Sequence, residues 1–111
     1  ICELPMNSKK LGLLLSVPPT HASVETVYRL SRAALQRNTE VYLYLIDEGV
    51  KNISDCRYQE LATDGVKLFA CAYGCQQQHV STDGIHSKIS LCGLVVLSGI
   101  IDACDQFLAF T

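Results

Sequence analysis

Two uninterrupted apolar segments most strongly constrain the fold of this chain. Lys10–Val17 and Val41–Ile46 are rich in leucine, valine and tyrosine, and neither alternates between apolar and polar residues. Continuous apolar runs of this length are typical of β-strands covered on both faces, as in parallel sheets. Gly65–Cys71 and Gln106–Phe110 have similar composition and are predicted to be further strands.

The segments between these strands have the pattern of helices. Residues 24–36 place apolar side chains on one face and charged ones on the other, which predicts a helix of about four turns. Ser54 or Asp55 is expected to cap a second helix that stops at Asp64-Gly65. A third helix should begin near Cys71, and a fourth should span Ser90–Ala103.

Strands that alternate with helices predict right-handed βαβ crossovers. We therefore expect residues 1–111 to form one α/β domain, with residues 1–8 as a mobile tail. Its mainly parallel sheet of about five strands should carry helices on both faces, as a flavodoxin-like or Rossmann-like three-layer sandwich.

Composition limits the partners that this domain can have. The chain has 9 basic and 11 acidic residues, a net charge of -2 and no basic cluster larger than Lys9-Lys10, so nucleic acid is not an expected partner. The apolar stretch Leu91–Ala103 is too short to span a bilayer, so no membrane segment is expected. With 49% apolar and 18% charged residues, the protein should bury part of its surface in an oligomer.

The cysteines leave two cellular compartments to consider. A secreted protein of this size would use its 6 cysteines as a disulfide framework, and Met6–Val17 followed by Thr20-His21-Ala22 resembles a signal peptide. However, the apolar run is short and ends at Pro18-Pro19, and it also makes a good first strand. We therefore expect a cytoplasmic protein with reduced thiols.

Cys71 is the cysteine predicted to stand where chemistry occurs in such a fold. Ligands and reactive groups gather at the carboxyl ends of parallel strands, and Cys71 ends the third strand. The loops Ser16–His21 and Asp47–Asn52 should leave the sheet at the same edge. Helical N–H groups after Cys71 should stabilise its thiolate, whereas the nearby Asp47 and Glu48 would oppose this.

Cys75 and His79 follow Cys71 at helical spacing, which raises the question of a disulfide or a metal site. Side chains four residues apart on a helix have Cβ atoms about 5–6 Å apart, so a Cys71–Cys75 disulfide needs a distorted turn. Eight residues of helix rise about 12 Å, so Cys71, Cys75 and His79 cannot share one ion. No glycine-rich phosphate loop follows the first strand. We expect neither a metal nor a cofactor.

The other candidate nucleophiles have structural explanations. Cys92 and Cys104 are expected to pack in or beside the last apolar helix, while Cys56 should lie on a short helix and Cys2 in the tail. Ser16, Thr20 and His21 lack a nucleophile-elbow motif, and Thr20 or Ser23 is more simply explained as a helix cap.

Several short motifs make the chain resemble the DsrE/TusD-like, or DsrE/DsrF-like, sulfur-relay family. They are Glu48–Asn52 after the second strand, Gly65-Val66 before the third, Cys71 at its end, Gly93-Leu94 in the last helix and Asp105–Phe110 at the close. The resemblance implies that Cys71 accepts sulfur as a persulfide and passes it to a partner thiol. It also implies a homotrimer, a homohexamer or a mixed hexamer, with sulfur donor and acceptor proteins or small thiols as partners.

The chain departs from this family pattern after Cys71. Gln77, Gln78 and His79 replace a basic pair and a glycine, so His79 occupies a helix-end position that suits glycine better. Cys75 is an additional thiol that could act as a second thiol beside Cys71.

Three functions remain open from the sequence. The first is a sulfurtransferase subunit that carries persulfide on Cys71. The second is a non-catalytic module that binds a ligand or protein at the strand edge through Ser16, Glu48, Gly49, Asn52 and Tyr73. The third is a thiol redox sensor that uses Cys71 and Cys75.

Overall fold

The computed structural model describes residues 9–111 and confirms the parallel α/β architecture. Its strands are β1 (Lys10–Leu15), β2 (Glu40–Leu45), β3 (Lys67–Cys71), β4 (Ile89–Cys92) and β5 (Gln106–Phe110). Its helices are α1 (Ala22–Gln36), the 3-10 helix η2 (Asp47–Ser54), α2 (Cys56–Thr63), α3 (Ala72–Gln77) and α4 (Leu94–Ala103). The predicted mobile tail, including Cys2, lies outside the described residues.

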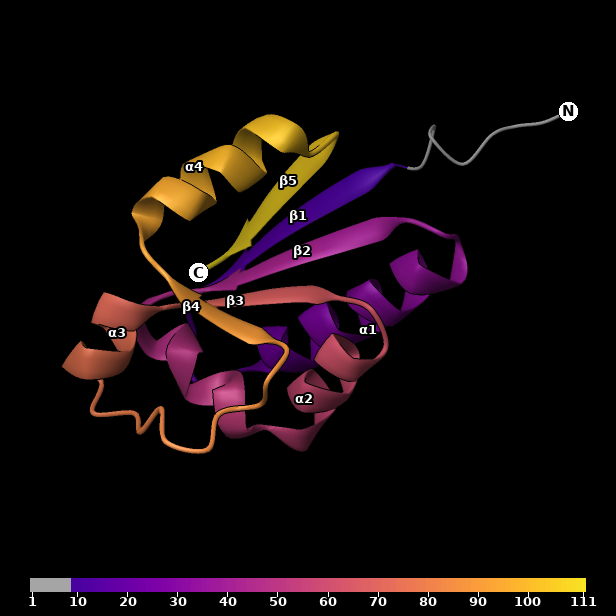
Figure 1. The fold of residues 1–111 in the computed structure, drawn as a ribbon. Coiled ribbons are helices and arrows are strands. Elements are labelled where there is room, and N and C mark those ends of the chain that lie inside the picture. Colours follow the sequence, from indigo (N-terminus) through magenta and orange to yellow (C-terminus); the bar gives the residue numbers. More distant parts are fainter. Residues whose placement is uncertain (1–8) are drawn as a thin grey trace, which may run out of the picture.

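The order of the strands determines how the helices are shared between the two faces of the sheet. The five strands lie in the order β4-β3-β2-β1-β5, and all neighbouring strands are parallel. From β1 to β4 the chain steps in one direction across the sheet, and from β4 to β5 it returns to the opposite edge. Because such crossovers are right-handed, this reversal puts α4 on the face opposite α1 and α2, as Figure 1 shows.

The two faces are therefore covered unequally. On the face under α1 and α2, Leu13, Leu43 and Leu45 are fully buried. On the other face, Leu14, Tyr42 and Phe107 remain partly exposed beside α4 (Figure 1). One helix thus covers a face that would need two or more helices, and the α4 face keeps apolar surface in contact with solvent.

The prediction of a single helix over Ser90–Ala103 is wrong at its start. Ile89–Cys92 instead forms β4, which pairs with Leu68–Cys71, and α4 begins only after Gly93. A short apolar run is compatible with both a strand and a buried helix. Hydrogen-bonded pairing with β3 therefore determines the conformation of this segment.

Several local predictions concern the ends of helices. Gly65 and His79 both adopt the positive φ expected after α2 and α3, at 118° and 56°. Asp55 caps α2 as predicted, since its side chain accepts a hydrogen bond from the N–H of Arg57. The cap predicted at Thr20 or Ser23 is wrong, because the ring of His21 accepts the N–H of Ser23 instead.

Among residues 9–111, no helix is both long and apolar enough to cross a bilayer.

Gly49 holds η2 against the carboxyl end of β1. A Cβ atom at Gly49 would overlap the backbone carbonyl of Leu15, so no other residue fits without moving the backbone. By contrast, Gly99 lies within α4 with nothing near its Cβ position. Gly99 therefore serves as a matched control for testing the close contact between Gly49 and the backbone of Leu15.

Replacing Gly49 with alanine should lower the free energy of unfolding by at least about 2 kcal/mol, because the overlap forces β1 and η2 apart. Gly99→Ala should raise it by about 0.5–1 kcal/mol, since alanine favours a helix interior. Urea unfolding of both variants measures these values. Equal effects of the two substitutions would show that η2 does not contact β1 this closely.

Candidate thiol site at the ends of β3 and β4

The candidate site lies at the carboxyl ends of β3 and β4, the edge at which open α/β sheets usually hold their ligands. The connection that leaves β3 through α3 returns on the α1 and α2 side, whereas the connection that leaves β4 forms α4 on the other side (Figure 1). Cys71 ends β3 and Cys92 ends β4, so a thiol stands at each side of this point.

Cys71 is the N-cap of α3, as the strand-end position predicted. Its Sγ accepts a hydrogen bond from the N–H of Gly74 at 3.4 Å. This contact turns the sulfur inward, and only 4% of the residue is exposed. Cys71 is therefore buried in the single chain, although its neighbours Ala72 and Tyr73 are both exposed.

The first turn of α3 packs closely against η2. A Cβ atom at Gly74 would lie 3.1 Å from the side chain of Val50 and 3.4 Å from the backbone nitrogen of Asp47. Asp47 itself has a positive φ of 52°, which is uncommon for a residue other than glycine. The small Gly74 thus allows η2 to pack closely against the first turn of α3.

Cys92 lies elsewhere than the sequence predicted. It was expected in or beside the apolar helix, but it is the last residue of β4 and the direct in-register partner of Cys71. It is partly exposed, and its Sγ lies 4.0 Å from the carbonyl oxygen of Ala70. The two thiols are therefore neighbours across adjacent strands, a relation that only the strand pairing reveals.

Tyr44 brings a hydroxyl to the same two thiols. Successive side chains of a strand point to opposite faces, so Tyr44, Cys71 and Cys92 share the α4 face by their register in β2, β3 and β4. The Tyr44 hydroxyl donates to the carbonyl of Gly93 at 3.0 Å, and the residue is fully buried. Burial, and then charge on Cys92 and Cys71, raises the pKa of this phenol well above its ordinary value.

Sequence reasoning did not identify Tyr44 as part of the site. The sequence feature that could have identified Tyr44 is its spacing of two residues from Tyr42, which puts two aromatic residues on one face of a buried strand.

The thiols of Cys92 and Cys75 are both more basic than an ordinary cysteine. Burial raises the pKa of Cys92, and the nearby hydroxyl of Tyr44 partly offsets this. Burial also raises the pKa of Cys75, as does charge on Cys71. Cys75 lies one turn along α3 within the hydrophobic core and is only 2% exposed.

As expected, Cys56 lies on the short helix α2 and Cys104 lies directly after α4.

The residues predicted to form a ligand-binding edge are spread over several environments. Asn52 is fully buried, and its side-chain amide donates to the carbonyls of Val17 and Gly49, so it ties η2 to the loop after β1. Its Oδ1 atom has no hydrogen-bond partner. Glu48 is exposed and pairs with Lys51. Ser16 is partly buried and its N–H donates to the carbonyl of Phe110, while Tyr73 is 67% exposed on α3.

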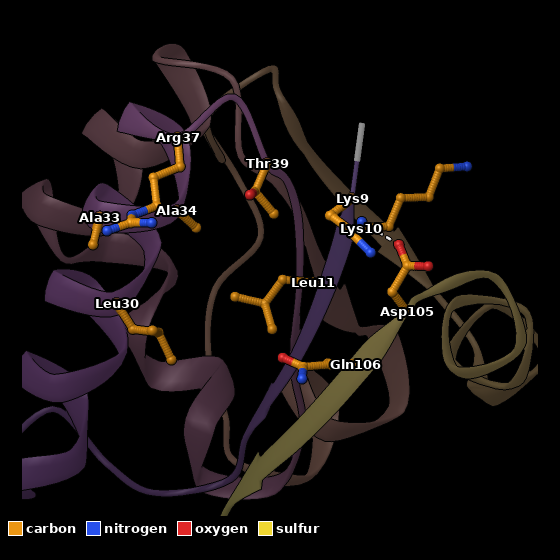
Figure 2. Close-up of a pocket in the computed structure, with 10 residues that line it drawn as sticks. All are labelled: Lys9, Lys10, Leu11, Leu30, Ala33, Ala34, Arg37, Thr39, Asp105 and Gln106. Carbon is orange, nitrogen blue, oxygen red and sulfur yellow. Dashed lines mark hydrogen bonds between the residues drawn. The ribbon is translucent and has the colours of Figure 1, made fainter. Parts of the chain in front are cut away.

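Neither of two surface pockets includes Cys71 or Cys92. One, of about 640 Å³, opens at the amino edge of the sheet between α1, β1 and β5. Figure 2 shows Leu11 and Leu30 in this pocket, with Arg37 on one side and, on the other, the backbone N–H of Lys10 donating to the carboxylate of Asp105. The second, of about 350 Å³, lies beside the amino ends of β3 and β4.

Residues 9–111 contain no group of three or more potential ligands arranged to hold a metal ion.

Comparison with known proteins identifies the group to which this architecture belongs. The model of the DsrE/DsrF-like family matches residues 9–110. A search of curated proteins finds no match.

Three solved structures share the fold at low sequence identity. The YchN protein from E. coli is 18% identical with a TM-score of 0.77, and the match covers 93% of this chain and 99% of that one. BT1422 from Bacteroides thetaiotaomicron, a protein of unknown function, is 14% identical with a TM-score of 0.74, covering 98% and 100% of the two chains. MTH1491 from Methanobacterium thermoautotrophicum, also of unknown function, is 12% identical with a TM-score of 0.75, covering 91% and 99%.

Replacing Tyr44 with phenylalanine should raise the pKa of Cys92, because the hydroxyl group that lowers this pKa is removed. At a fixed pH below this pKa, less thiolate is present, and iodoacetamide should alkylate Cys92 more slowly, by an order of magnitude at most. Tyr42→Phe is the control, since Tyr42 lies on the same strand and bonds Glu40 instead. An unchanged rate-against-pH profile for Cys92 in Tyr44→Phe would contradict the contact.

Proposed function

Because this chain belongs to the DsrE/DsrF-like family, we propose that it is a sulfur-relay protein that accepts sulfane sulfur as a persulfide on Cys71 and passes it to a partner thiol. The observation that carries the proposal is the position of Cys71 at the end of β3, where its sulfur receives the N–H of Gly74. A backbone N–H directed at sulfur favours the anionic forms of a thiol and of a persulfide.

The transfer is an exchange between sulfur atoms that needs no external oxidant. The Cys71 thiolate attacks the outer sulfur of a donor persulfide, the new S–S bond forms on Cys71, and the donor leaves as a thiolate. In the reverse sense, an acceptor thiolate attacks the outer sulfur on Cys71, and Cys71 leaves as a thiolate. The N–H of Gly74 supports Cys71 both as nucleophile and as leaving group.

The apolar surface of the α4 face supports an oligomer, as the family resemblance also implies. Large apolar side chains that are at least a third exposed lie along α4: Leu94, Val95, Val96 and Ile101. Val95, at the start of α4, is 87% exposed. Apolar patches of this kind mark protein interfaces, and we propose a homotrimer or homohexamer formed through this face.

Sulfur loading tests the proposed role of Cys71. When the reduced protein is incubated with inorganic polysulfide and then alkylated and digested, the peptide Leu68–Lys88 should carry one added sulfur atom. Cys71→Ser should remove this sulfur. Cys75→Ala, on the same peptide, should keep it, which distinguishes the two thiols.

The other functions give different results in the same experiment. A redox sensor would lose two hydrogen atoms and give crosslinked cysteine peptides. A non-catalytic binding module would show neither change. Sulfur that stays on Leu68–Lys88 in Cys71→Ser would show that the acceptor is a different thiol.

A single charge should disrupt the proposed oligomer. Val95→Glu places a carboxylate in the apolar patch, so the assembly should dissociate to smaller species because the charge would be desolvated at the interface. Size-exclusion chromatography with light scattering measures this. Gln36→Glu adds the same charge to the exposed end of α1 on the other face and should leave the mass unchanged. A wild-type protein that is a monomer at all concentrations would refute the assembly.

A further inference from the structure

We propose that Cys92 is the second thiol of this site and exchanges the sulfane sulfur with Cys71, so that sulfur reaches and leaves the buried Cys71 through Cys92. This inference rests on the proposed function, because it needs Cys71 to hold a persulfide. It differs from the sequence-based expectations that Cys75 would be the second thiol and that Cys92 would only pack.

The strand pairing brings the two thiols within reach of each other. Cys71 and Cys92 are in-register partners on parallel neighbouring strands, so their side chains leave the sheet on the same face. Adjacent strands lie about 4.8 Å apart, which falls within the range of Cα separations that a disulfide spans. An outer sulfur extends either side chain by about 2 Å. A persulfide on one cysteine therefore reaches the sulfur of the other without movement of the backbone.

The two thiols differ in their access to solvent. The connections after β3 and β4 leave on opposite faces of the sheet (Figure 1). Cys92 is partly exposed, while Cys71 is 4% exposed. Gly93, directly after Cys92, is also exposed. An external thiol therefore meets Cys92 more readily than Cys71.

Cys75 fits the role of second thiol less well. It is 2% exposed within the hydrophobic core, so sulfur transferred to it would not come closer to solvent. On a helix its Cβ lies about 5–6 Å from that of a residue four positions away. Cys75 also lacks the polar neighbour that Cys92 has, since the hydroxyl of Tyr44 lowers the pKa of Cys92 against the effect of burial.

The exchange balances without a further reactant. The Cys92 thiolate attacks the outer sulfur of the Cys71 persulfide, the S–S bond to Cys71 breaks, and a new S–S bond forms on Cys92. Cys71 leaves as a thiolate that the N–H of Gly74 stabilises. The outer sulfur keeps its oxidation state throughout, and the negative charge moves from Cys92 to Cys71. Tyr44 is a positioning residue here, because its buried hydroxyl lies beside both sulfurs and ties Gly93 in place.

The positions of the lysines make the two thiols separable by digestion. Cleavage after Lys67 and Lys88 puts Cys71 and Cys75 on one peptide and Cys92 and Cys104 on another. In wild-type protein loaded with inorganic polysulfide, added sulfur should appear on both peptides. In Cys104→Ala it should remain on both, which assigns the sulfur on the second peptide to Cys92. Sulfur confined to the first peptide at all times would overturn the proposal.

The rate of release tests the role of Cys92 in function. Cys92→Ala should still hold sulfur on Cys71 but should release it to glutathione at least about tenfold more slowly, because a nearby thiol acts at a higher effective concentration than an external one. Cys104→Ala, a substitution of another partly buried cysteine, should release sulfur at the wild-type rate. If Cys92→Ala does not fold, Cys92→Ser should give the same slow release.

The outcomes separate this inference from the proposed function. If wild-type protein takes up no sulfur on Leu68–Lys88, the proposed function of Cys71 fails. If Cys71 is loaded but Cys92→Ala and Cys92→Ser both release sulfur at the wild-type rate, the proposed function stands and the role of Cys92 is refuted. Slow release in the Cys92 variants, with a normal rate in Cys104→Ala, supports both.

Discussion

The reversal of chain direction after β4 is the constraint on which the rest of the structure depends. Strands β1 to β4 are laid down side by side, and the chain must then cross the whole sheet to place β5 next to β1. Right-handed crossovers force this last connection onto the second face. The same step leaves α4 alone on an incompletely covered apolar face. By their register in β3 and β4, Cys71 and Cys92 point to this same face, so the candidate site and the proposed interface share one side of the sheet.

The buried position of the thiols determines how such a site can work. Burial raises the pKa of Cys75 and Cys92, so these thiols are mostly protonated at neutral pH and react slowly with bulk solvent. A sulfur carrier benefits from this protection, because an exposed persulfide is readily lost to any thiol or oxidant. Fast transfer must then come from proximity, and the in-register pairing of Cys71 with Cys92 provides it.

The sequence predicted much of this fold but only part of the site. The continuous apolar runs of β1 and β2 and the spacing of the third apolar segment were sufficient to predict a parallel sheet with Cys71 at the carboxyl end of a strand. Ile89–Cys92 could not be recognised as a strand, because four apolar and small residues next to an apolar helix have no period of their own. Once β4 was missed, the register that joins Cys92 and Tyr44 to Cys71 could not be inferred, since it is a property of strand pairing. Burial of Cys71 was likewise unpredictable, because it depends on tertiary packing around the end of the strand.

The most direct test of the account is a crystal structure of the protein loaded anaerobically with sulfane sulfur and measured at a wavelength where sulfur scatters anomalously. The account predicts one extra anomalous peak about 2 Å from the Sγ of Cys71 or of Cys92, at the carboxyl ends of β3 and β4. An extra sulfur found only on Cys75, Cys56 or Cys104, with none at Cys71 and Cys92, would contradict it.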